Sequence, residues 1–314
     1  VIDLEGQLAI PGFVEAHGHW MCLGHSKMML DLNQARSWDE IVAMVEEAAA
    51  GAEPGEWILG RGWHQEKWDE VPTPSVDGVP LHHQLSAVSP ENPVDLGHAS
   101  GHASFANALA MELAGIDAST EDPPGGTIVK DASGQPTGLL RETAQRLVDR
   151  ALAHSQEGRS PEEIQAEERE AVRLAGEDAL SKGVTSFHDA GADFATIDFF
   201  KALESEGNLP VRLYVMVRRE SNEDMAARLP EYKMLPEGND FLTVRSIKRQ
   251  VDGALGAHGA WLLEPYEDHE SVGLVLEPLE DIMGTARVAI QHGFQVNTHA
   301  IGDRGNQEIL DLYE

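Results

Sequence analysis

Apolar runs of strand length alternate along the chain with segments of helical periodicity. The strand-like runs lie at residues 8–16, 184–189, 211–217, 241–251 and 294–298. Ser37 and Ser160 each begin a capping box, and these predict helices at 37–51 and from 160 to about 182. Helical periodicity also covers residues 194–207, 279–292 and 303–314. Such alternation predicts a parallel sheet with crossover helices.

Residues 52–159 interrupt this alternation. They are rich in Gly, Pro and Trp, and the Asp131–Gly134 segment predicts a hairpin turn. Because long insertions after a strand often carry function, we expect a subdomain that lies over the strand ends. An insertion remote from the chemistry is the alternative. The expected domains are a first β/α unit at 1–51, the inserted subdomain at 52–159 and four further strands with helices at 160–314.

Histidine and aspartate residues stand at the ends of four predicted strands. In chain order they are His17 with His19, His188 with Asp189, Asp252, and His299. The C-terminal ends of parallel strands form the rim on which barrel enzymes build their active sites. His17 and His19 are two residues apart and therefore project from the same face of a strand. Such a pair can hold a divalent metal, zinc being the commonest, or can be two hydrogen-bonded surface imidazoles.

Lys248 lies inside a predicted strand, where some side chains point inward. A buried lysine is costly unless it is paired or neutralised. It can reach the sheet edge or pair with a carboxylate. Alternatively it can become a carbamate that bridges metal ions, or form a Schiff base in a metal-free barrel lyase or aldolase.

The amino-acid composition argues against some classes of binding partner. The formal net charge is −31, with 54 acidic and 23 basic residues, which argues against nucleic acid and anionic membranes as partners. The single cysteine, Cys22, excludes an internal disulfide and is expected to be a small buried residue rather than a ligand. No apolar run reaches the roughly 18 residues of a membrane span.

Seven segments together resemble one known family. They lie at 11–19, 100–109, 125–142, 183–191, 248–256, 264–266 and 299–304. In this order they resemble the metal-dependent amidohydrolase superfamily, specifically the amidohydrolase-3 branch with its YtcJ-like and N-substituted formamide deformylase-like proteins. The resemblance implies an α/β fold: a partial TIM-like (β/α) barrel with about five of eight strands and a large inserted subdomain after strand 1.

The resemblance also implies a ligand set. His17 and His19 match the first-strand metal ligands, and His299 matches the fifth-strand ligand. Lys248 matches the position where many relatives carry a carboxylated lysine that bridges two metals. We therefore expect one or two divalent ions, with zinc favoured. The candidates for substrate binding are Trp63, His102, Glu142, His188, Asp189, Asp252 and Asp303.

The implied activity is hydrolysis of a non-peptide C–N bond of amide type by metal-activated hydroxide, on a small-molecule substrate. The aspartate that relatives use for proton transfer is expected beyond Glu314. We therefore expect this chain to be a fragment that is inactive alone and cytoplasmic, with export of a longer parent protein as the alternative. The rival hypotheses are a Schiff-base lyase that uses Lys248 and a non-catalytic binding paralogue.

Overall fold

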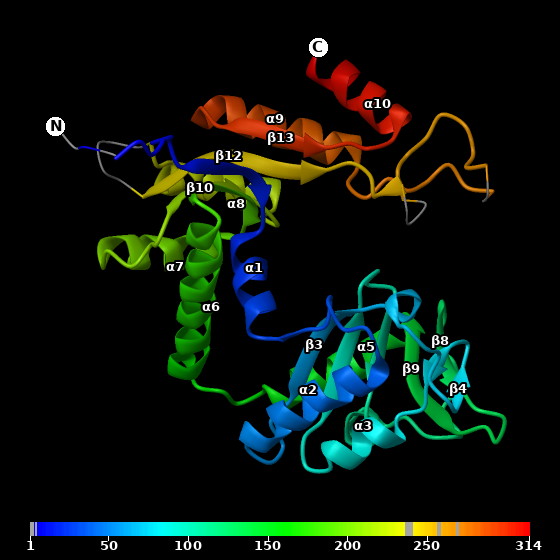
Figure 1. The fold of residues 1–314 in the computed structure, drawn as a ribbon. Coiled ribbons are helices and arrows are strands. Elements are labelled where there is room, and N and C mark those ends of the chain that lie inside the picture. The colour runs from blue at the N-terminus through cyan, green and yellow to red at the C-terminus, as the bar shows by residue number, and fades with distance from the viewer. Residues whose placement is uncertain (1–2, 4, 236–240, 256–258, 268–269) are drawn as a thin grey trace. The chain divides into compact units, whose positions relative to one another are not determined.

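The computed structural model describes residues 3, 5–235, 241–255, 259–267 and 270–314. The chain forms two compact units, and many of their helices and strands are labelled in Figure 1. Unit 1 comprises Val1–Gly24 and Val172–Glu314, and unit 2 comprises His25–Ala171. Each unit has its own sheet and its own hydrophobic core, so each is described by itself.

Unit 1 is built on a five-stranded parallel sheet in the order β1-β10-β11-β12-β13. The strands are β1 (Phe13–Gly18), β10 (Val184–Ala192), β11 (Arg212–Val217), β12 (Leu242–Gln250) and β13 (Gln295–His299). The sheet curls into a half barrel, with β1 and β13 as its two edge strands. The predicted α/β fold and partial barrel are therefore confirmed.

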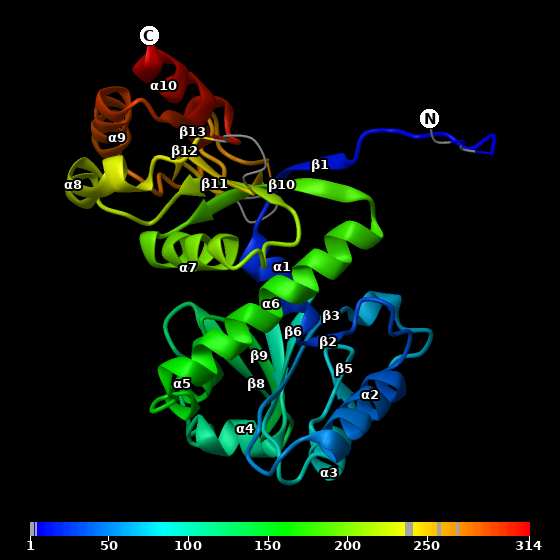
Figure 2. The same cartoon turned by 90° about the vertical axis from the view of Figure 1, so that its left-hand side faces the viewer.

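Helices cover one face of this sheet (Figure 2). They are α6 (Pro161–Ser181), α7 (Phe194–Ser205), α8 (Asn222–Tyr232) and α9 (Leu279–His292). Two further helices are α1 (Trp20–Lys27) and α10 (Asp303–Tyr313). The core between sheet and helices includes Phe187 of β10, Phe200 of α7 and Leu229 of α8. Because side chains alternate along a strand, the opposite face is left for polar residues.

Unit 2 contains a six-stranded mixed sheet in the order β2-β3-β6-β7-β9-β8. Its strands are β2 (Leu30–Asp31), β3 (Ile58–Trp63), β6 (Val94–His98), β7 (Ala103–Ala106), β8 (Gly126–Lys130) and β9 (Pro136–Glu142). A separate hairpin joins β4 (Ser75–Val76) and β5 (Val79–Pro80). The helical segments are α2 (Trp38–Gly51), η1 (Gln65–Lys67), α3 (His83–Val88), α4 (Ala108–Leu113) and α5 (Gln145–Ser155).

Two cores flank the sheet of unit 2, one on each face. One contains Trp38 and Ile41 of α2, and the other contains Met111 of α4 and Val148 of α5. Figure 2 shows the sheet between these helices. The strands can carry apolar side chains on both faces because helices cover both.

The structure differs from the sequence-based expectations at two points. Helix α2, which we expected in the first barrel unit, packs in the core of unit 2, and this unit runs from His25 to Ala171 rather than from residue 52 to 159. The amphipathic periodicity of α2 predicts that one face of the helix is buried, but it does not determine which sheet packs against that face. Cys22 is exposed, so the prediction of a buried cysteine was wrong. Across the described residues, every helix is too short or too polar to cross a bilayer.

Candidate active site

The uncovered face of the five-stranded sheet lines a cavity of about 930 Å³. His17 of β1, His188 of β10 and Lys248 of β12 all line it, together with His299, the last residue of β13. The parallel order of the strands brings these four side chains together from positions up to 282 residues apart in the sequence. Of the residues at the strand ends, His17, His188 and His299 line this cavity, whereas His19 and Asp189 line a smaller one.

His17 of β1 and His19, which directly follows this strand, are arranged edge to face. Their ring centroids are 6.2 Å apart with an interplanar angle of 86°. Partial burial and the Lys248 ammonium lower the pKa of His17, and partial burial and the Arg218 guanidinium lower the pKa of His19. Both imidazoles are therefore neutral at pH 7, the form that binds metal. His19 lines a second, smaller cavity, whereas His17 lines the large one.

Lys248 is almost completely buried, with 7% of its surface exposed. Burial and the charge of Arg218 lower the pKa of its ammonium group. Among the described residues no carboxylate pairs with it and no acceptor receives a hydrogen bond from it. The simplest alternative from the sequence, a lysine neutralised by a carboxylate, is thus not found there.

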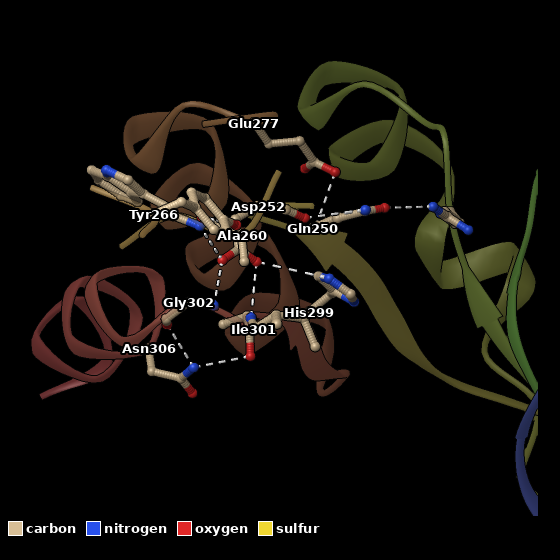
Figure 3. Close-up of polar contacts among 12 residues, drawn as sticks. Gln250, Asp252, Ala260, Tyr266, Glu277, His299, Ile301, Gly302 and Asn306 are labelled. Atoms are coloured by element: carbon tan, nitrogen blue, oxygen red, sulfur yellow. Dashed lines mark hydrogen bonds and ion pairs between the residues drawn. The ribbon is translucent and has the colours of Figure 1, made fainter. Parts of the chain in front are cut away.

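His299 lies beside the fully buried carboxylate of Asp252. Its Nε2 is 3.8 Å from Oδ1 of Asp252, and in the described part of the chain this buried nitrogen has no hydrogen-bond partner. Asp252 accepts hydrogen bonds from the backbone N–H groups of Trp261, Ile301 and Gly302, at 2.7–2.9 Å. Figure 3 shows the carboxylate between His299 and these loops. Asp252 thus positions the loops and does not line the cavity.

The remaining candidates of unit 1 have different surroundings. His188 lines the large cavity with its ring 4.9 Å from the Tyr214 ring. Asp189 projects to the other side of β10, lines the smaller cavity and has its pKa raised to about 6 by burial. Asp303 is exposed and accepts backbone hydrogen bonds from Leu263 and Arg304.

Of the three substrate-binding candidates in unit 2, one is a core residue and the other two form a polar pair. Trp63 is 1% exposed and donates from Nε1 to the carbonyl oxygen of Leu96 at 2.7 Å. His102 Nδ1 lies 3.2 Å from Oε2 of Glu142, and both side chains are exposed. Trp63 is therefore a packing residue, whereas His102 and Glu142 are accessible to a ligand.

The candidate ligands have the kind of donor atoms that bind a divalent cation. His17 and His19 are neutral imidazoles, the buried Nε2 of His299 has no partner in the described residues, and Lys248 is an unpaired amine there. Within those same ranges, no three His, Cys, Asp or Glu side chains converge closely enough to hold a metal ion. The fit therefore rests on donor chemistry and on the cavity that His17, Lys248 and His299 share.

Sequence reasoning missed Arg218. This residue directly follows Val217, where a predicted strand ends, so the same strand-end rule points to it. Arginine is not a metal ligand, so a pattern made of histidine and aspartate does not include it. Arg218 lies close enough for its charge to lower the pKa of His17, His19 and Lys248.

A family model described as the amidohydrolase family (amidohydrolase 3) matches residues 1–314. The chain belongs to the amidohydrolase family. This confirms the resemblance drawn from the seven sequence segments, which run in the family's order. Family membership supports hydrolase chemistry.

Three curated relatives match over the whole chain. It is 33% identical to Protein LONG AFTER FAR-RED 3 of Arabidopsis thaliana, covering 53% of that protein. It is 31% identical to the putative amidohydrolase YtcJ of Bacillus subtilis (strain 168), of which it covers 56%. It is 30% identical to the N-substituted formamide deformylase of Arthrobacter pascens, of which it covers 57%. The chain therefore spans about half the length of these relatives.

Two crystal structures share the fold. An uncharacterized metal-dependent hydrolase from Pyrococcus horikoshii OT3 superposes with a TM-score of 0.68 at 24% identity, over 96% of this chain and 56% of that one. Another from Pyrococcus furiosus superposes with a TM-score of 0.67 at 25% identity, over 96% of this chain and 57% of that one. Both of these proteins are described as metal-dependent hydrolases.

Proposed function

We propose that this chain supplies the metal-binding side of the active site of a hydrolase that cleaves a non-peptide C–N bond of amide type. One observation carries the proposal: His17, Lys248 and His299, from three different strands, line one cavity on the uncovered face of the half barrel. The relative named N-substituted formamide deformylase supports an amide-like bond as the target. A small organic amide is the substrate class that follows.

The ligand roles follow from the donor chemistry. His17, His19 and His299 would hold the cation through ring nitrogens, and zinc is the cation that such a set most often binds. In its neutral form the amine of Lys248 can add to carbon dioxide, forming an N–C bond with loss of a proton, and the resulting carbamate would offer oxygen donors to a cation. A cation held there would supply Lewis acidity and would lower the pKa of a water molecule to about 7.

The other residues of the site form the cavity wall or hold the loops around it. His188 and Tyr214 form part of the cavity wall, with Asn297 of β13 on the other side of Lys248. Asp252 fixes the loops after β12 and β13, and its Oδ1 lies 3.8 Å from Nε2 of His299. No proton-transfer group is assigned among the described residues.

We also propose that turnover needs a longer polypeptide. In the described residues, β1 and β13 each lack a partner on their outer side, so the cavity is open between the two edge strands. Exposed water competes with substrate and weakens every electrostatic interaction in such a site. We therefore expect the 314-residue chain to bind metal weakly and to be inactive alone.

The test compares the 314-residue chain with a C-terminally extended version of it, both loaded with zinc, by amine release from an N-substituted formamide. We expect hydrolysis by the extended protein only, with abolition by a chelator and by His299→Ala. His154→Ala is the matched control, because His154 is an exposed histidine of unit 2 that pairs with Glu157. Equal activity of the two proteins would refute the need for a longer polypeptide, and activity that survives chelation would refute the metal-dependent hydrolase.

A Schiff-base enzyme is the second candidate. The observation that favours it is the lowered pKa of the buried Lys248 amine, which makes the nucleophilic neutral form more available. Borohydride trapping with a carbonyl substrate would label Lys248 in that case. The hydrolase proposal predicts no such label, and an extended protein that neither hydrolyses amides nor forms the adduct would be a binding paralogue.

A further inference from the structure

Arg218 stands at the C-terminal end of β11, next to the candidate ligands. It lines a cavity of about 190 Å³ together with His19 and Arg219, and the carboxyl groups of Asp189 and Asp193 lie at the same cavity. The cavity is distinct from the larger one that contains Lys248 and His299. It therefore offers a place for a part of the substrate other than the group that meets the metal.

The guanidinium group is held in position from two sides. Nη2 donates a 2.9 Å hydrogen bond to Oε1 of Gln250, and the backbone N–H of Gln250 is in turn bound by Glu277. On the other side the Arg218 stem packs on Gly191, where an added Cβ would lie 2.4 Å from Cδ of Arg218. Because its conformation is fixed before binding, Arg218 loses little entropy when it takes a ligand.

Most of its hydrogen-bonding capacity is unused. A guanidinium has five N–H donors, and among the described residues Gln250 is the only side-chain partner of Arg218. Neither nearby carboxyl group forms an ion pair with it there. Asp189 accepts from the backbone N–H of Gly191, and Asp193 accepts from that of Thr196 as the N-cap of α7.

Such an arginine is suited to a planar anion. Two parallel N–H donors match the two oxygens of a carboxylate, a geometry that lysine does not offer. A fixed cation is also needed because a protein with a net charge of −31 repels anionic ligands at long range.

We propose that Arg218 binds a carboxylate of the substrate and so selects amides that carry a carboxylate near the scissile bond. The identity of the scissile bond rests on the proposed function, whereas the carboxylate site itself does not. The proposal makes Arg218 a specificity residue that contacts substrate in the smaller cavity.

The test measures binding of two small amides to the 314-residue chain by ligand-observed NMR titration. Succinamate and succinamide differ in one group, a carboxylate in the first and a neutral amide in the second. We expect wild type to bind succinamate about tenfold or more tightly than succinamide, the factor typical of a charged hydrogen-bonded contact. Arg218→Met should abolish this preference, and Arg218→Lys should restore only part of it.

Arg212→Met is the matched control. Arg212 lies at the opposite end of the same strand, over the Phe241 ring, so the variant removes the same charge outside both cavities. It should keep the wild-type preference, and circular dichroism checks that all variants are folded. Equal affinity of wild type for the two amides, or equal loss in both arginine-to-methionine variants, would overturn the proposal.

The two proposals can fail separately. If succinamate binds through Arg218 but the extended, zinc-loaded protein hydrolyses no amide, the carboxylate site stands and the proposed function fails. If that protein hydrolyses charged and neutral amides equally well, and Arg218→Met changes neither KM, the function stands and the carboxylate site fails.

Discussion

Asp252 is fully buried, yet it accepts three backbone hydrogen bonds from two loops. Ile301 and Gly302 follow β13, and Trp261 belongs to the segment after β12. The carboxylate thus ties together the loops that follow two strands of the candidate site. A carboxylate with several N–H partners can be buried because those donors replace the water that it loses.

The first prediction concerns this carboxylate. Asp252→Ala should lower the free energy of unfolding by about 3 kcal/mol or more, because three N–H groups lose a charged acceptor. Asp252→Asn keeps one acceptor oxygen and should lose less. Urea denaturation measures both, with Asp311→Asn in the exposed part of α10 as the control. An alanine variant as stable as wild type would contradict the role given to Asp252.

Asp95 in unit 2 is another carboxyl group, and the burial of its Oδ1 affects how stability depends on pH. Within the described residues its Oδ1 has no hydrogen-bond partner, and burial, with a smaller effect from Asp149, raises its pKa to about 7. The folded state therefore binds a proton between about pH 4 and 7 that the unfolded state has released. Stability is highest below this range and falls as the pH rises through it.

The second prediction follows from this decrease of stability with rising pH. Asp95→Asn cannot ionise, so the free energy of unfolding should decrease less between pH 5 and pH 8 than it does in wild type. At pH 8 the variant should be the more stable protein. Thermal and urea unfolding at both pH values give the comparison, with the exposed Glu121→Gln as control. A pH dependence unchanged from wild type would show that Asp95 is ionised throughout.

At the scale of elements, local sequence signals located the helices well. The prediction of a helix at 279–292 with a stop at Gly293 matches α9, and Gly293 has a φ of 69°. Ser160 and Glu163 form the predicted reciprocal capping box, with bonds of 2.8 and 3.2 Å. Caps and periods are local, so a few neighbouring residues determine them.

Non-local pairing was not predictable in the same way. The six-stranded sheet of unit 2 contains parallel and antiparallel strands from residues 30–142. The order of these strands cannot be predicted from any local sequence pattern. For the same reason α2 was assigned to the wrong sheet. The buried role of Asp252 was also missed, since only the fold brings residue 261 and residues 301–302 around it.

The third prediction tests the contact between β1 and β10. Gly18 of β1 lies so close to Phe187 that an added Cβ would be 2.2 Å from its Cζ. Gly18→Ala should destabilise the protein by about 1–3 kcal/mol, because Phe187 must leave its place against Trp20. Gly51→Ala is the control, since nothing lies within 4 Å of that position.

A double variant separates crowding from other effects of the alanine. Phe187→Leu alone should cost stability, but in the Gly18→Ala background it should cost less, because the shorter side chain relieves the clash. Urea unfolding of the four proteins gives the interaction energy. Strictly additive losses would mean that Gly18 and Phe187 do not determine the spacing of these strands.

At the scale of the whole molecule, the candidate site depends on topology more than on any one motif. His17 and His299 share a cavity only because the sheet places β1 and β13 at the two edges of one curled surface. The sequence could predict this because strand ends in parallel order meet on one side. It could not predict that Trp63 would be a core residue of unit 2, since its burial depends on the packing of that unit.

The central claim is that His17, His19, Lys248 and His299 bind a shared divalent cation. Calorimetric titration of the 314-residue chain with Zn²⁺ tests it most directly. We predict saturable binding that weakens on the order of tenfold or more in His17→Ala and in His299→Ala, because even the loss of a residue that only orients a ligand commonly costs that much. His154→Ala should bind as wild type does. Zinc affinity equal in all four proteins would contradict the account.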